Sequence, residues 1–375
     1  MRLSQQRHAI WQFAAAAALV LIAFAGKRLN APTRSGAGAD AACVPDESFA
    51  LQLGRAGEPG RGRAAISPWQ MPWTAWKDIL WRTYGQISED RLLAVAAGVV
   101  FYTLLALFPA VTAFVSLYGL FAQVATIPDH LSLASGFVPG AGIDIINEQI
   151  ARLAAKGNTK LGLGFAAGVA LALWSSNAGI KAVIDALNVI YEEREKRGFV
   201  MLNLTSLAFT LGGILALLVG VAAVVVLPLF LAYVGMSGPG ESLLRVLRWP
   251  ALFVLIVIGL ELIYRFGPSR REARWRWLTV GSLLAATLWL IGSLLLSWYL
   301  ENFAHYDITY GSLGAGIALM MWLWMSSIVI LLGAELNSEI EHQTARDSTI
   351  GAAKPLGARG AQMADTVGAA HSGSG

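Results

Sequence analysis

The chain has 375 residues and a formal charge of +4; 56% of its residues are hydrophobic and only 14% are charged. Soluble domains carry about 25% charged residues, so the composition excludes an ordinary soluble fold. The single cysteine, Cys43, excludes an internal disulfide, and no two of the five histidines stand at metal-ligand spacing. Phosphate-binding and nucleophile-elbow motifs are absent from the sequence as well. We therefore expect no cofactor, no metal site, no catalytic residue and no enzymatic activity.

The first 66 residues have two parts. Residues 1–28 contain the apolar stretch Ala9–Gly26, followed directly by Lys27 and Arg28. This stretch resembles a cleaved secretory signal, an uncleaved anchor, or upstream sequence included by a wrong start codon; the basic pair behind it favours the last two. Residues 29–66 are rich in Gly, Ala, Arg and Pro and have little periodicity, which predicts a disordered linker.

An amphipathic helix is predicted between residues 67 and 90. Trp73, Trp76, Leu80 and Tyr84 recur at spacings of three and four residues, which places them on one helical face. Tryptophan and tyrosine favour the headgroup region of a membrane. The segment is therefore either an interfacial helix or a helix simply packed on the rest of the protein.

Six apolar stretches follow, each long enough to cross a hydrocarbon core of about 30 Å. None carries a charge near its centre, where one would cost about 2.5–3.5 kcal/mol. They predict an all-α, polytopic membrane protein: a six-helix transmembrane bundle within residues 67–342, accompanied by interfacial amphipathic helices. The N-terminal apolar stretch would add a further hydrophobic helix. The predicted spans are Leu93–Phe121, Leu161–Ile180, Leu204–Leu227, Trp249–Phe266, Trp277–Leu300 and Ser312–Leu336.

The connections between the spans carry an uneven charge. If the first span enters from the cytoplasm, fifteen Lys and Arg residues fall on the cytoplasmic side of the bundle and five on the other. Basic residues accumulate on the cytoplasmic side of membrane proteins. We therefore predict that both ends of the bundle are cytoplasmic.

Three further segments have a recognisable pattern. Ile143–Leu153 is predicted to be an amphipathic helix on the outer surface. Ile180–Tyr191 either extends the second span inward or forms a separate interfacial helix. Residues 343–375 are small and polar, which predicts a disordered cytoplasmic tail.

A few helix-disturbing, small or polar residues lie inside or beside the spans. Pro109 predicts a kink, either a packed one or a hinge. Gly281 and Ala285 permit close helix contact, and Glu261 precedes Arg265 at the spacing of an intrahelical ion pair. Glu335 lies near the end of the last span, at an intramembrane or a headgroup position. A carboxylate within the membrane is a hypothesis for a functional site.

Several motifs then combine into a recognisable order. They are Arg91–Leu93 with Phe101–Pro109, Leu173–Asn177 with Ala186–Tyr191, Tyr264–Arg265 with Pro268, Tyr310–Ala315, and Leu332–Asn337. The chain resembles the YihY/BrkB family of bacterial inner-membrane proteins over residues 73–342. The resemblance implies six spans with cytoplasmic ends and a virulence-associated or envelope role. Members of the family have carried the label ribonuclease BN, but this sequence offers no metal ligands or general base for a nuclease.

These observations select a set of polar and hinge positions as the candidate site. They are Tyr102, Pro109, Trp174, Asp185, Asn188, Tyr191, Tyr264, Arg265, Tyr310, Gly311, Gly314, Glu335 and Asn337. These positions form one functional site only if key members of the set meet in one cavity. Those members are Tyr102, Trp174, Asp185, Tyr310 and Glu335.

Three functions compete on this reading. The first is a transporter or flippase-like handler of a lipid or small amphipathic envelope substrate. The second is a non-transporting envelope scaffold, and the third is a membrane-associated ribonuclease, the least favoured. The expected partners are membrane lipids and a lipid or small-molecule substrate, with no nucleic acid. The sequence predicts no oligomeric state.

Overall fold

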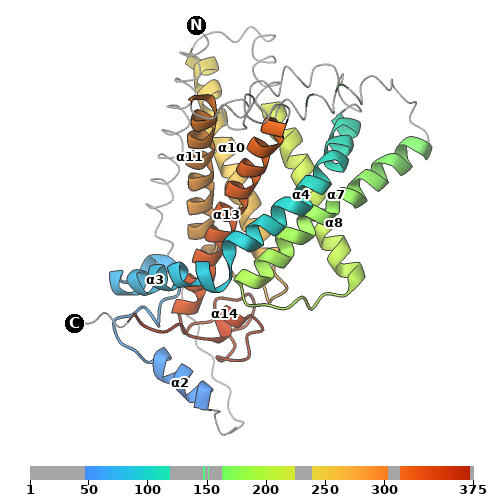
Figure 1. The fold of residues 1–375 in the computed structure, drawn as a ribbon. Coiled ribbons are helices and arrows are strands. Elements are labelled where there is room, and N and C mark those ends of the chain that lie inside the picture. Colours follow the sequence, from blue (N-terminus) through green and yellow to red (C-terminus); the bar gives the residue numbers. More distant parts are fainter. Residues whose placement is uncertain are drawn as a thin grey trace.

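The computed structural model describes residues 47–118, 163–223, 239–302 and 313–371, and the single residues Asn147 and Ala151 (Figure 1). Long helices dominate the described residues, and an antiparallel β-bridge joins Ala273 to Thr349. The elements are α2 (Glu47–Ala56), η1 (Pro68–Gln70), α3 (Trp73–Glu89), α4 (Leu92–Tyr118), α7 (Leu163–Ile190), α8 (Phe199–Val221), α10 (Pro239–Phe266), η5 (Trp275–Trp277), α11 (Thr279–Asn302), α13 (Leu313–Gln343) and α14 (Gln362–Asp365).

Helix α13 lies at the centre of the arrangement and packs against α11, α4, α3 and α7. On one side α10 packs against α11. On the other side α8 packs against α7, and α7 packs along α4. Figure 1 shows α11 beside α10 and α13, while α4 and α7 slant away together and α8 crosses them. The protein is an all-α bundle, as the sequence predicts.

Each of the six predicted spans coincides with a long helix. Four of the described helices, α8, α10, α11 and α13, contain stretches long and apolar enough to cross a membrane, and α3 with α4 make a fifth if they form one span through a bend of 60°. Helix α7 is not among them; its second half carries the polar residues Ser175, Asn177 and Lys181. Six crossings therefore remain a prediction.

The interior of the bundle is apolar. Phe253 and Tyr264 of α10, Leu187 of α7 and Leu331 of α13 belong to one buried cluster. The Tyr264 hydroxyl donates to the Ile330 carbonyl over 2.7 Å, which fixes α10 against α13. Large apolar side chains on the outer faces, such as Phe101 of α4 and Leu204 of α8, are exposed. A membrane protein shows this pattern because lipid, rather than protein, covers its outer faces.

One end of the bundle, called the base below, gathers the polar structure. It comprises α3, the joint at residues 90–91, the loops 191–198 and 267–274, the last turns of α13 and the tail 344–371. In Figure 1 it is the lower end, where α2, α3 and α14 lie. Helix α3 buries Ala75, Asp78, Ile79 and Thr83 and packs on α13.

The aromatic face predicted for residues 67–90 is largely exposed on α3, because Trp73, Leu80 and Tyr84 are all more than half exposed. This exposure fits a helix that lies in a membrane interface. Ile180–Tyr191 is resolved as the continuation of α7, which runs unbroken to Ile190.

Two segments predicted to be disordered have defined structure where the structure describes them. Residues 47–66 form α2 and a loop, and residues 344–371 wind across the base and form α14. The disorder predicted for residues 29–66 and 343–375 is thus corrected for these parts. Hydrogen bonds hold these segments, and such bonds require no apolar periodicity in the sequence. The Arg359 guanidinium donates to the Ala345 carbonyl over 2.6 Å, and the Thr344 hydroxyl donates to the Ala65 carbonyl over 2.7 Å.

The predictions for Ala9–Gly26 and for the helix Ile143–Leu153 lie outside the described residues, apart from Asn147 and Ala151, each of which is in a helical turn.

Candidate functional site at the base of the bundle

The last turns of α13 carry an unusual density of buried polar residues. Glu335, Asn337, Glu339 and Glu341 are each at most 1% exposed. Burying a carboxylate is costly unless it is paired or hydrogen-bonded. The four residues differ in how their polar groups are paired, and together they define the candidate site.

Glu341 is held in a bidentate ion pair. The Arg270 guanidinium donates to its two carboxylate oxygens over 2.8 and 3.0 Å, and the Ser348 hydroxyl donates to it over 2.9 Å. The same guanidinium lies 4.0 Å from the ring centroid of Tyr191, the residue directly after α7. This arrangement ties the loop 267–274, α7 and the tail to the end of α13.

Glu339 is held by α3. The Arg82 guanidinium donates to its carboxylate over 2.5 Å and to the Gln343 side-chain oxygen over 2.8 Å. One turn earlier on α3, the buried Asp78 accepts from Arg61 over 2.8 Å and from the backbone N–H of His371 over 2.9 Å. Both chain ends of the described structure therefore meet on the inner face of α3.

Asn337 joins two helices directly. Its side-chain oxygen accepts from the Gly281 N–H over 2.8 Å, and its amide nitrogen donates to the Leu278 carbonyl over 3.0 Å. The first of these bonds satisfies the Gly281 N–H in the first turn of α11, where a helix leaves its N–H groups without an intrahelical partner.

Glu335 differs from its neighbours because neither of its carboxylate oxygens has a hydrogen-bond donor in the described structure. Its side chain is within hydrogen-bonding reach of Asp90, a second carboxyl group, at the joint between α3 and α4. The Oδ2 atom of Asp90 also lacks a donor. The residue that follows, Arg91, has a left-handed backbone with φ of 50°.

The loop 191–198 is fastened by a second polar group. Asn188 accepts from the Ser269 N–H over 2.7 Å and donates to Glu195 over 3.1 Å. The Arg197 guanidinium, hydrogen-bonded to Glu195 over 2.7 Å, lowers the pKa of that carboxyl to about 2.

A basic pocket with a volume of about 380 Å³ opens beside this loop, between the start of α8 and the end of α10. Its apolar wall includes Met201 and Phe266. Its basic wall consists of Lys196, Arg197, Arg265, Arg270 and Arg271, with Glu272 as the single acidic residue.

The basic residues of this pocket are not equally free. Lys196, Arg197 and Arg270 pair with Glu193, Glu195 and Glu341 respectively. Arg265 contacts Glu272 at 3.2 Å and stacks on Trp275, but its Nε and Nη1 atoms have no acceptor in the described structure. The Nη1 atom of Arg271 has none either. Donor atoms without an acceptor therefore remain on Arg265 and Arg271, and on Arg270 at its Nε atom alone.

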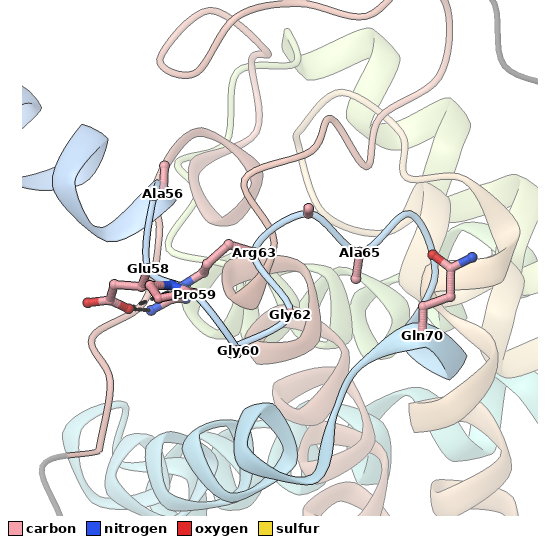
Figure 2. Close-up of a pocket in the computed structure, with 10 residues that line it drawn as sticks. Ala56, Glu58, Pro59, Gly60, Gly62, Arg63, Ala65 and Gln70 are labelled. Carbon is pink, nitrogen blue, oxygen red and sulfur yellow. Dashed lines mark hydrogen bonds and ion pairs between the residues drawn. The ribbon is translucent and has the colours of Figure 1, made fainter.

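Figure 2 shows a second hollow, of about 480 Å³, in the loop after α2. Its charged residues are already paired: Arg63 is directed at Glu58, at 2.7 Å, and also donates to the carbonyls of Gln343 and Gly368. The polar groups of this hollow hold the loop after α2 against the end of α13 and the tail, and so stabilise the fold.

The predicted site residues do not meet in one cavity. Tyr102 and Trp174 are 49% and 53% exposed on the outer faces of α4 and α7, and Asp185 is exposed as well. Pro109 lies inside α4, and Gly314 is buried in the first turn of α13. Tyr310 and Gly311 lie outside the described residues.

The remaining predicted residues gather toward the base: Asn188, Tyr191, Tyr264, Arg265, Glu335 and Asn337. Glu335 is fully buried within the protein at the base; its depth in the membrane stays a prediction. The predicted pair between Glu261 and Arg265 is wrong, because Arg265 turns to Glu272. The loop after α10 brings that carboxylate back beside the helix end.

Sequence reasoning missed Asp90, Arg82, Arg270, Glu339 and Glu341. One signal was available: Glu335, Glu339 and Glu341 crowd the end of the last apolar stretch within two turns of helix. The arginines of residues 270–276 entered the sequence analysis only as markers of orientation. Their pairing with glutamates distant in sequence required the structure.

The described residues contain no group of three or more His, Cys, Asp or Glu side chains arranged to hold a metal ion. Together, the lipid-facing helices and the polar base define a polytopic α-helical membrane protein. The chain belongs to the virulence factor BrkB family, which matches residues 83–356.

Three curated relatives illustrate the range of that family. The putative ribonuclease-like protein YfkH of Bacillus subtilis is 30% identical over 65% of this chain and 88% of its own. The UPF0761 membrane proteins of Pseudoalteromonas translucida and Cronobacter sakazakii are 28% and 29% identical, over 72% and 71% of this chain and 88% of their own in both cases. No solved structure matches the chain.

Proposed function

We propose that this protein binds an anionic amphipathic lipid of the bacterial inner membrane at the basic pocket and moves it in a transporter or flippase-like manner. The observation that carries the proposal is the pocket itself: one wall offers guanidinium donors, the other is apolar, and it opens between the ends of two candidate spans. A phospholipid has the same two-part chemistry.

The orientation deduced from the sequence supports this proposal. The basic loops of the base would face the cytoplasm under the positive-inside rule. Anionic lipids are enriched in the inner leaflet, and basic pockets between helices on that side bind their headgroups. Arg265 and Arg271 would contact the phosphate, and Met201 and Phe266 would contact the first part of the acyl chains.

Lipid binding to reconstituted protein tests the first half of the proposal. Substituting Arg265→Gln and Arg271→Gln together should weaken binding of phosphatidylglycerol, because each basic residue near the surface contributes about 1 kcal/mol, or roughly fivefold in affinity. Arg194→Gln is the matched control, since Arg194 is an exposed arginine of the neighbouring loop that does not line the pocket. Phosphatidylcholine and inorganic phosphate serve as comparison ligands. Equal affinity of wild type and the double variant for phosphatidylglycerol would remove the site.

Flux of fluorescent phosphatidylglycerol across vesicles tests the second half. Wild type and the Arg194→Gln variant should translocate the lipid, and the double variant should not. Absence of flux from wild type, together with a stable partner on purification, would instead favour the scaffold function. Cleavage of RNA by the purified, metal-replete protein would favour the ribonuclease function that the name of the Bacillus relative suggests.

A further inference from the structure

Two carboxyl groups meet inside the base with no cation assigned to them. Glu335 of α13 is 0% exposed, and neither of its oxygens has a donor. Asp90, at the joint between α3 and α4, is its neighbour. Neither residue lines the basic pocket, and nothing in the proposed lipid binding uses this contact.

The charged groups around this contact do not neutralise it. Glu339, also on α13, and Glu192, at the end of α7, add negative charge. Three basic residues of the base serve other carboxylates: Arg82 of α3 and His342 of α13 pair with Glu339, and Arg270 pairs with Glu341. Two ionised carboxylates in contact, one fully buried and one partly buried, without a paired counter-charge, would be unfavourable.

Polar atoms without partners continue from the contact along α3. Thr83 and Gln86 each have a buried side-chain oxygen with no hydrogen bond, and they share with Asp90 the helix face at spacings of three, four and seven residues. The hydroxyl of Tyr191, which is 0% exposed, is unpaired as well. Buried polar atoms in native proteins are normally bound by protein, water or an ion, so this set points to a ligand.

A proton fits these groups better than a metal ion does, since no metal-binding group occurs among the described residues. A protonated carboxyl group has an O–H donor, whereas an ionised one only accepts. One proton therefore converts two repelling acceptors into a hydrogen-bonded pair. We propose that Asp90 and Glu335 form a proton-binding site that holds one shared proton at neutral pH.

The site occupies the place where α3 meets α4 at a 60° bend and where Arg91 has a left-handed backbone. Loss of the proton leaves two negative charges in contact, which repel each other and push the joint away from α13. The occupancy of the site and the position of α3 are thereby coupled.

Infrared spectroscopy of the full chain in lipid tests this proposal, because a protonated carboxyl group absorbs apart from a carboxylate. Wild type at pH 7 should show the band of a buried carboxylic acid, and both Glu335→Gln and Asp90→Asn should abolish it. In either variant the amide donates to the remaining carboxylate, which then stays ionised. Glu192→Gln, at an exposed neighbouring carboxylate, is the control and should retain the band.

Three results would overturn the proposal: absence of the band in wild type at pH 7, its persistence in both variants, or its loss in only one of them, which would assign the proton to a single residue. The experiment measures no lipid flux, so it stands or falls separately from the proposed transport.

Discussion

Arg270 and Glu341 form a fully buried ion pair, with side chains 1% and 0% exposed. Removing one partner leaves the other charge buried alone, which costs about 3–5 kcal/mol, whereas replacing both with apolar residues of similar volume is much less costly. Glu341→Leu and Arg270→Met should therefore each lower the free energy of unfolding strongly, and the double variant should recover much of the loss. Denaturant unfolding in detergent provides the measurement. Additive losses would contradict the pairing.

Glu195 gives the base a defined pH dependence. Its pKa is lowered from 4.5 to about 2 in the folded protein, chiefly by the Arg197 side chain. A carboxyl group with a depressed folded pKa stabilises the protein above its unfolded pKa, and that contribution is lost as the pH falls through the folded value. We expect the melting temperature to fall between about pH 4.5 and pH 2, and Glu195→Gln to reduce this dependence.

The exposed Glu192 offers the control for that experiment, since Glu192→Gln should leave the acid dependence as in wild type. If Glu195→Gln melts with the same pH profile as wild type, the contact with Arg197 does not stabilise the fold.

At the scale of elements, the crossing of α11 and α13 depends on two glycines. A Cβ atom added to Gly281 would lie 2.1 Å from the Gly333 carbonyl oxygen, and one added to Gly333 would lie 2.7 Å from the Ala285 side chain. Small residues at helix crossings let backbones approach closely. Gly281 and Ala285 are the pair that the sequence singled out for close contact.

Alanine at either glycine should therefore force the helices apart. We expect Gly281→Ala to lower the free energy of unfolding by about 1–3 kcal/mol, the usual cost of overpacking. Gly259→Ala in α10 is the matched control, because a Cβ there meets nothing within 4 Å. Helix α10 should tolerate that change or gain about 0.5–1 kcal/mol. Unfolding curves of the two variants that coincide would refute the close crossing.

The elements also show how far sequence reasoning reaches. Apolar runs predicted the positions of the long helices. A helix that crosses lipid needs an unbroken apolar stretch of a set length, and such a stretch can be read from the local sequence alone. The polar base was predicted only in part: Glu335 and Asn337 drew attention because they follow an apolar run. Arg270 and Glu341 did not, because their pairing joins residues 71 positions apart. The order of residues 344–371 was not predicted for the same reason, since hydrogen bonds to distant backbone groups leave no hydrophobic periodicity in the sequence.

At the scale of the whole molecule, the tail closes the base. The Gly368 N–H donates to the His342 carbonyl, and the Gly368 carbonyl accepts from Arg63 over 2.7 Å. Truncation is tolerated only where the removed backbone makes few such contacts. Removing residues 344–375 should therefore lower the melting temperature and make the loop around Arg63 sensitive to protease.

Removal of the last four residues, 372–375, supplies the comparison, because every tail contact named above would be retained. A long truncation that melts and resists protease as wild type does would show that the tail contributes nothing to the base.

The joining of the two chain ends sets an order of events during synthesis. Translation releases a chain from its N-terminus at roughly 5–20 residues per second. Arg63 leaves the ribosome 305 residues before Gly368, and Asp78 leaves 293 residues before His371. For about 15–60 s at that rate, Arg63 and the inner face of α3 have been synthesised, but the tail residues that contact them, Gly368 and His371, have not. The molecule can therefore complete its base only after α13 has been inserted and residues 344–371 have followed it out of the ribosome.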